Sequence, residues 1–186
     1  MKKSLLTLSA IVLSLGSFAQ NPGPFWNNLL NCNWPTTSMA ANYMDVVDAN
    51  IVWSNAIYGT GRGSEFFSRT INGGTSFNSG NILPDTNSWM ISNIDGIDAN
   101  NAWVAAYRNT TGANTATIDV LYHTINGGTN WTNGGNATMF SDAAAFADWV
   151  VFLTPNIGVA MGDQNPLSGG KHEIWRTVNE IGRAHV

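Results

Sequence analysis

The apolar and polar positions of this chain alternate in short runs that predict β-strands. In the middle of the chain, the apolar runs 94–97 and 102–107 flank a turn at Asp98-Ala99-Asn100. Residues 118–125 form a further β-rich run, and an Asn-Gly-Gly turn leads from it into a strand at Trp131. Runs bounded by Asx and glycine turns are typical of antiparallel hairpins. The pattern therefore predicts four short antiparallel strands in this segment.

The same order of elements recurs along the chain. Residues 67–77 align with 121–131, and a third copy runs from 174 to Asn179, so the Asn-to-Asn spacings are 54 and 53 residues. A second marker precedes each copy: Asp48-Ala49-Asn50 leads to Trp53, Asp98-Ala99-Asn100 leads to Trp103, and the degenerate Thr154-Pro155-Asn156 leads to Val159. Four short strands in each period of about 50 residues are typical of the blades of a β-propeller.

The repeated hairpin resembles the Asp-box, or BNR repeat, which reads Ser/Thr-x-Asp-x-Gly-x-Thr-Trp. Asn takes the place of Asp in all three copies, and the Trp position holds Phe77 in the first copy and Trp131 in the second. An Asx oxygen can still cap the turn amides, the glycines permit positive φ, and the aromatic residue can pack between blades. We expect a structural role for ten hairpin residues: Thr70, Asn72, Gly74, Phe77, Thr124, Asn126, Gly128, Trp131, Thr177 and Asn179.

Over about residues 42–179 the chain resembles secreted bacterial propellers of the sialidase-like, sortilin-like and photosystem II assembly factor-like superfamily, many of which carry a type IX secretion domain. The resemblance implies an all-β fold, an incomplete β-propeller of about two and a half four-stranded antiparallel blades. We expect a lead-in segment at 20–41, a first blade at 42–91, a second at 92–147 and a partial third at 148–179.

The two ends of the chain look unlike the repeats. Residues 1–19 combine Lys2 and Lys3 with an apolar run and a small-residue end, which predicts a signal peptide and an extracellular protein. Residues 180–186 match the translation of a sequencing adapter, and Glu180 stands where the repeat requires Gly. We therefore expect an artefactual tail and an N-terminal fragment of a longer protein.

Charge and cysteine content restrict the kinds of partner that the chain can bind. Without the expected signal peptide and tail, five Lys and Arg stand against eleven Asp and Glu, a net charge of −6. Such a chain has no basic footprint for nucleic acid, and we expect no membrane span in the mature protein. Cys32 is the single cysteine, so it forms no internal disulfide. We favour a buried thiol, with a bridge to a cysteine outside this sequence as the alternative.

No catalytic or metal-binding pattern stands out, and we expect neither a cofactor nor a metal. The chain has no Gly-x-Ser-x-Gly elbow, and His123 and His172 fall in different blades. Residues 95–100 faintly resemble a calcium loop, but Asp98 lies in the repeated turn, which favours a turn cap. Arg69, His123 and Arg176 share one repeat position, which indicates a scaffold role.

The connections between strands predict where a ligand binds. The Asp-Ala-Asn turns and the Asn-Gly-Gly hairpins are two strands apart and should share one rim. The other rim carries the variable segments 59–64, 80–90, 108–116, 133–147 and 163–171, and variable loops on a repeated scaffold often bind ligands. Candidate contacts there are Arg62, Arg108, Asp163, Trp89 and Phe140.

These observations predict a secreted, non-catalytic binding or scaffold module whose extracellular ligand is a glycan or a protein. The alternative is a sialidase-like or xyloglucan-degrading glycoside hydrolase, whose catalytic residues would lie mostly in further blades. The fold alone does not separate the two.

Overall fold

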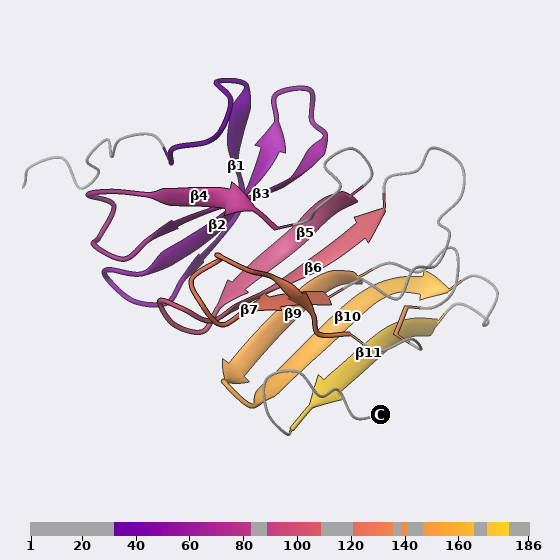
Figure 1. The fold of residues 1–186 in the computed structure, drawn as a ribbon. Coiled ribbons are helices and arrows are strands. Elements are labelled where there is room, and N and C mark those ends of the chain that lie inside the picture. Colours follow the sequence, from indigo (N-terminus) through magenta and orange to yellow (C-terminus); the bar gives the residue numbers. More distant parts are fainter. Residues whose placement is uncertain are drawn as a thin grey trace, which may run out of the picture.

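The computed structural model describes residues 32–82, 89–108, 121–135, 139–140, 147–165 and 171–178. Within these ranges the chain forms three antiparallel sheets that follow one another in space in chain order (Figure 1). The expected signal peptide, the expected tail and Asn179 lie outside the described residues.

Each sheet is a meander in which every strand pairs with its neighbours in sequence. The first sheet contains β1 (Met39–Val46), β2 (Val52–Tyr58), β3 (Gly63–Thr70) and β4 (Asn78–Asn81). The second contains β5 (Trp89–Gly96), β6 (Ala102–Arg108), β7 (Leu121–Thr124) and β8 (Thr132–Asn133). The third contains β9 (Ala147–Thr154), β10 (Ile157–Asn165) and β11 (Lys171–Thr177). The all-β class and the four-stranded antiparallel sheets are confirmed.

The sheets start earlier than the sequence pattern suggested. β1 begins at Met39, and β5 begins at Trp89, inside the range expected for the first blade. The cause is the ladder with β6, in which Trp89 faces Arg108 and Met90 faces Tyr107. Met90 and Ile91 in this extension are buried, so β5 already carries core residues before the apolar run at 94–97.

The turns after β1, β5 and β9 are capped by the side chain of their first residue. Asp48 Oδ1 accepts hydrogen bonds from the amides of Asn50 (2.7 Å) and Ile51 (2.9 Å), and Asp98 Oδ1 accepts the same pair from Asn100 and Asn101. Thr154 Oγ1 takes this role in the third sheet, at 3.3 and 3.2 Å. The turn-cap interpretation of Asp98 is therefore confirmed.

The Asn-Gly-Gly hairpins are closed by their own side chains. Asn126 Oδ1 accepts a hydrogen bond from the Asn130 amide (2.9 Å), and Thr124 Oγ1 accepts one from the Gly128 amide (2.9 Å). Asn72 and Thr70 make the equivalent bonds in the first sheet. Gly127 and Gly128 have φ values of 72° and 86°, which glycine adopts most readily.

The hairpins lie beside the Asp-Ala-Asn turns, as predicted. The Gly73 amide donates to the Asn50 carbonyl at 3.0 Å, and the Gly127 amide donates to the Asn100 carbonyl at 2.9 Å. Both turn types therefore share one rim of the molecule, which we call the hairpin rim.

The core consists of two layers of side chains, one between each pair of neighbouring sheets. In the first layer, the Trp131 ring lies 6.2 Å from Trp53 and 5.5 Å from Phe67. In the second, Trp103 stacks on Phe152 at 4.9 Å. Trp131 thus packs between sheets, as the sequence predicts.

Backbone amides also link each sheet to the one before it. Asp45 Oδ2 accepts a hydrogen bond from the Gly96 amide (2.8 Å), and Asp95 Oδ2 accepts one from the Phe152 amide (2.9 Å). Asp45 and Asp95 lie three residues before Asp48 and Asp98, so the same bond recurs at both interfaces.

Candidate functional site

The rim opposite the hairpins brings together polar and aromatic side chains from all three sheets. Here β2, β6 and β10 end, and β3, β5, β9 and β11 begin. We call this surface the variable rim, and define it by Tyr58, Arg62, Glu65, Met90, Tyr107, Asp148, Asp163 and His172.

The first sheet contributes a tyrosine, an arginine and a buried carboxylate. Tyr58 Oη donates to Glu65 Oε1 at 3.3 Å, and the Arg62 guanidinium lies 5.7 Å from the Tyr58 ring centre. Burial and the Glu65 carboxylate raise the pKa of Tyr58, while Arg62 opposes the shift. The tyrosine is therefore a neutral hydrogen-bonding group at physiological pH.

Met90 connects the first and second sheets at this rim. A Cβ atom on Gly63 would lie 2.9 Å from Met90 Sδ, so glycine allows the two strands to approach closely. On its other side, Tyr107 Oη donates to Met90 Sδ at 3.5 Å. The thioether and the Tyr107 ring therefore form an apolar segment at this rim.

The third sheet contributes an acidic pair, next to Tyr107 of the second sheet. The carboxyl groups of Asp148 and Asp163 share a hydrogen bond. Burial and the Asp163 charge raise the pKa of Asp148 to about 6, and His172 opposes this shift. Burial and the Asp148 charge also raise the pKa of Tyr107. Asp148 therefore keeps its proton up to about pH 6, and this part of the rim gains negative charge above that pH.

The residues predicted to contact a ligand are placed to different extents by the structure. Arg62 and Asp163 both lie at the variable rim, and the backbones of Trp89 and Arg108 pair with each other there. The side chains of Trp89 and Arg108 lie outside the described part.

The expected role of Phe140 as a ligand contact is wrong. Only 1% of this residue is exposed, because it packs between the second and third sheets. Its backbone has a φ of 48°, and its amide donates a hydrogen bond to Glu173 Oε2 at 2.8 Å. Phe140 is a core residue and offers no ring to a ligand.

Sequence reasoning missed Tyr58, Glu65, Tyr107, Asp148 and His172. These residues stand outside the repeated motifs, and each lies on a strand near its end at this rim. A search for polar residues at those strand ends would have found them.

The residues of the shared repeat position pack as scaffold in the first two sheets. The Arg69 guanidinium lies 5.1 Å from the Trp53 ring, and the His123 ring stacks on Trp103 at 4.8 Å. Arg69 Nη1 also donates to the Ala99 carbonyl. Burial lowers the pKa of His123, which favours its neutral form.

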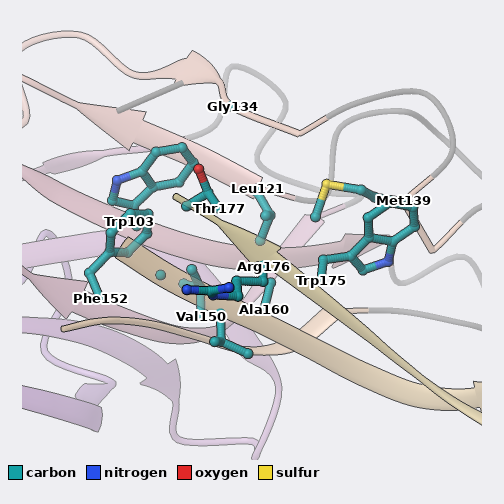
Figure 2. A pocket seen from close by; sticks show the side chains of 12 residues that line it. Trp103, Leu121, Gly134, Met139, Val150, Phe152, Ala160, Trp175, Arg176 and Thr177 are labelled. Atoms are coloured by element: carbon teal, nitrogen blue, oxygen red, sulfur yellow. The ribbon is translucent and has the colours of Figure 1, made fainter. Parts of the chain in front are cut away.

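A small apolar cavity lies between the second and third sheets. Trp103, Leu121, Met139, Phe152 and Trp175 are among the side chains that line it (Figure 2). Its volume of about 20 Å³ is close to the space that one water molecule needs. Trp131 fills the equivalent space between the first two sheets, so the cavity is a packing space rather than a ligand site.

Two kinds of feature are missing from the described ranges. No three His, Cys, Asp or Glu side chains there are grouped in a way that could hold a metal ion. The same residues include no helix that is long and apolar enough to cross a membrane.

The successive antiparallel meanders, two of four strands and one of three within the described residues, pack face to face and make this part of the chain an incomplete β-propeller. Two solved structures share this fold: "YCF48 bound to D1 peptide", with a TM-score of 0.54 and 15% identity, and "YCF48 from Cyanidioschyzon merolae", with a TM-score of 0.50 and 16% identity. They match 88% and 83% of this chain. The chain spans 44% and 38% of their lengths. No protein-family model matches the sequence, and no curated protein matches it.

Proposed function

We propose that this chain belongs to a secreted, non-catalytic β-propeller that binds a segment of a protein partner at the variable rim. The observation that carries the proposal is the series of side chains in which Tyr107 contacts Met90 and lies beside Asp148, which in turn interacts with Asp163. Residues 1–19 support secretion through their signal-peptide pattern. The solved propeller bound to D1 peptide supports a peptide as the kind of ligand.

The chemistry of the rim favours a segment with basic and apolar side chains. The acidic pair offers a negative site, and the neighbouring Tyr107, which rests on the buried Met90, offers apolar surface. Tyrosine is enriched in protein interfaces because its ring gives a large contact area and its hydroxyl a hydrogen bond. A basic residue against the acidic pair would gain a charge-assisted hydrogen bond.

The hairpin rim is less suited to recognition because its polar groups already form hydrogen bonds within the molecule. The side chains of Asn72 and Asn126 bond to backbone amides four residues ahead, and the turn amides of Gly73 and Gly127 bond to neighbouring carbonyls. We propose that these are Asp-box hairpins in which Asn replaces Asp and the role is structural.

The proposal is tested by selecting peptides from a displayed random library against the chain. We expect the selected peptides to carry Lys or Arg, and to bind at least about tenfold more weakly to the D148N/D163N variant. Ile71→Ser with Ile125→Ser is the matched control at the hairpin rim, since these side chains are 53% and 63% exposed. Peptides that lose affinity for the control variant but not for D148N/D163N would refute the proposal.

A glycoside hydrolase remains the second candidate, and the Asp148–Asp163 pair is the observation in its favour. However, the paired carboxyls of retaining and inverting hydrolases stand about 5–5.5 Å and 6.5–9.5 Å apart, too far to share a hydrogen bond. We expect no hydrolysis of a sialoside or of xyloglucan. Turnover that disappears in the D148N variant would establish the enzyme instead.

A further inference from the structure

The first strands of the three sheets bring two aromatic rings together. The Tyr43 ring of β1 and the Trp149 ring of β9 make an edge-to-face contact, with 5.3 Å between their centroids. The two residues belong to the first and third sheets, and β5 of the second sheet packs against both β1 and β9. Since the rings meet, both reach past β5 on the same side. Trp149 is 44% exposed, so part of its ring is open to a ligand.

Two carboxylates lie beside this aromatic pair. Asp45 follows Tyr43 by two residues on β1, so both side chains leave the same face of the strand. Asp95 is the equivalent residue of β5, because Asp45 and Asp95 lie three residues before the turn residues Asp48 and Asp98. Burial raises the pKa of Tyr43, and the charges of Asp45 and Asp95 raise it further, because both carboxylates are close to the phenol.

Each of these carboxylates has one oxygen that the links between sheets do not use. Oδ2 of Asp45 accepts the Gly96 amide, and Oδ2 of Asp95 accepts the Phe152 amide. Within the described residues, Oδ1 of either aspartate has no hydrogen-bond partner. Asp95 is only 9% exposed, and a buried carboxylate oxygen without a donor is unfavourable. A ligand that donates a hydrogen bond here would therefore be stabilised.

The described residues place no positive charge against this pair of carboxylates. Burial raises the pKa of Asp95 to about 7, the Phe152 amide opposes this shift, and the Asp45 charge adds to it. No Lys, Arg or His in the described ranges shifts the pKa of Asp95 or of Tyr43. A ligand with a positive charge would stabilise the ionised form of Asp95.

We propose that a primary alkylammonium group, either of a lysine side chain or of a free small amine, binds to a site formed by Tyr43, Asp45, Asp95 and Trp149. The ammonium N–H groups would donate to the unused oxygens of Asp45 and Asp95. The charge and the alkyl chain would lie against the exposed part of the Trp149 ring. None of the four residues belongs to the set that defines the variable rim, so this site can bind its ligand whether or not that rim binds a peptide.

Titration of the full chain with butylammonium chloride tests the proposal, at about pH 8, where Asp95 is mainly ionised. Proton–nitrogen NMR follows the indole N–H signal of Trp149, which is identified by its absence from the Trp149→Leu variant. We expect butylammonium to shift this signal until the site is saturated. Tetramethylammonium should bind more weakly because it has no N–H group to donate, and butanol should leave the signal unchanged because it has no charge.

Asp45→Asn with Asp95→Asn should weaken butylammonium binding at least about tenfold. Each Asn keeps an oxygen for its backbone amide and loses the charge, so the links between sheets remain. Asp48→Asn with Asp98→Asn is the matched control, because these turn caps also keep their acceptors and lose the same charge. The affinity of the control variant should stay within about twofold of that of the unchanged chain, because screening by salt weakens the effect of distant charges.

Trp149→Leu provides a second test, which decides the matter if the Asn pair alters the circular dichroism spectrum. With the Gly96 amide signal as the readout, this variant should bind butylammonium at least about fivefold more weakly. A Trp149 signal that does not respond to butylammonium would overturn the proposal. So would an equal response to butanol, or equal weakening by the Asn pair and its control.

The tripeptide acetyl-Gly-Lys-Gly-amide distinguishes the two sources of the ammonium group. Binding of the tripeptide at least as tight as that of butylammonium would identify a lysine side chain of a protein partner. Weaker binding of the tripeptide would identify a free small amine.

Discussion

Replacing Trp131 by Ala removes the aromatic side chain that packs between the first two sheets. The Trp131 ring contacts Trp53 and Phe67, at centroid distances of 6.2 and 5.5 Å. A fully buried Trp→Ala change costs about 3–5 kcal/mol, and the half-buried position of Trp131 lowers this figure. The buried indole N–H of Trp131 has no hydrogen-bond partner, so removing this N–H lowers the cost of the change by up to about 1 kcal/mol. We therefore expect a loss of about 2–3 kcal/mol in the free energy of unfolding.

Urea unfolding followed by circular dichroism measures this loss, and Phe77→Ala is the matched control. Phe77 holds the same position in the first hairpin, but its ring lines an open groove of the first sheet. We expect Phe77→Ala to cost less than about 1 kcal/mol, since less apolar surface becomes exposed. A Trp131→Ala cost below about 0.5 kcal/mol, or one equal to that of Phe77→Ala, would refute the packing argument.

Three further changes test the hairpins and the links between sheets by the same unfolding measurement. Gly128→Ala should cost about 2–4 kcal/mol, because its φ is +86° and the new Cβ would lie 2.1 Å from Phe67 Cζ. Gly61 has a similar φ of +84° but open space around it, so Gly61→Ala should cost only about 1–2 kcal/mol. Equal costs for the two variants would contradict the steric explanation. Asn126→Asp keeps the acceptor for the Asn130 amide and should change stability by less than about 0.5 kcal/mol, while Asn126→Ala should lose about 1–2 kcal/mol; a neutral alanine variant would show that the cap contributes nothing. Burial raises the pKa of Asp95 to about 7, so the folded state binds the extra proton, and this group lowers stability as pH rises from about 4 to about 7. Asp95→Asn keeps an acceptor for the Phe152 amide but has no proton to lose, so the variant should lose up to about 3 kcal/mol less stability between pH 5 and pH 8. If the variant and the unchanged chain have the same pH profile, Asp95 does not titrate in this range.

The sequence predicted what depends on local chemistry. The repeated Asp48, Asp98 and Thr154 turns cap their own amides, and Asn72 and Asn126 close their own hairpins, so neighbouring residues determine these elements. The shared rim of these turns follows from counting strands.

The variable rim depends on contacts between residues that are far apart in the chain. Asp148 and Asp163 meet only through the pairing of β9 with β10, and Tyr107 reaches them from another sheet. Phe140 shows the same limit, because no local pattern indicated that a loop aromatic would be buried between sheets. Asp45 and Asp95 each lie three residues before a repeated turn residue, but their role as acceptors depends on amides of the neighbouring sheet.

Hydrogen–deuterium exchange with a library-selected peptide tests most directly whether the variable rim is the binding face. Backbone amides in 58–65, 105–108, 147–149 and 161–165 should exchange more slowly when the peptide is bound. Amides in the hairpins at 71–77 and 125–131 should exchange at the same rate with and without peptide. Slower exchange confined to the hairpins would contradict the account and place recognition on the hairpin rim.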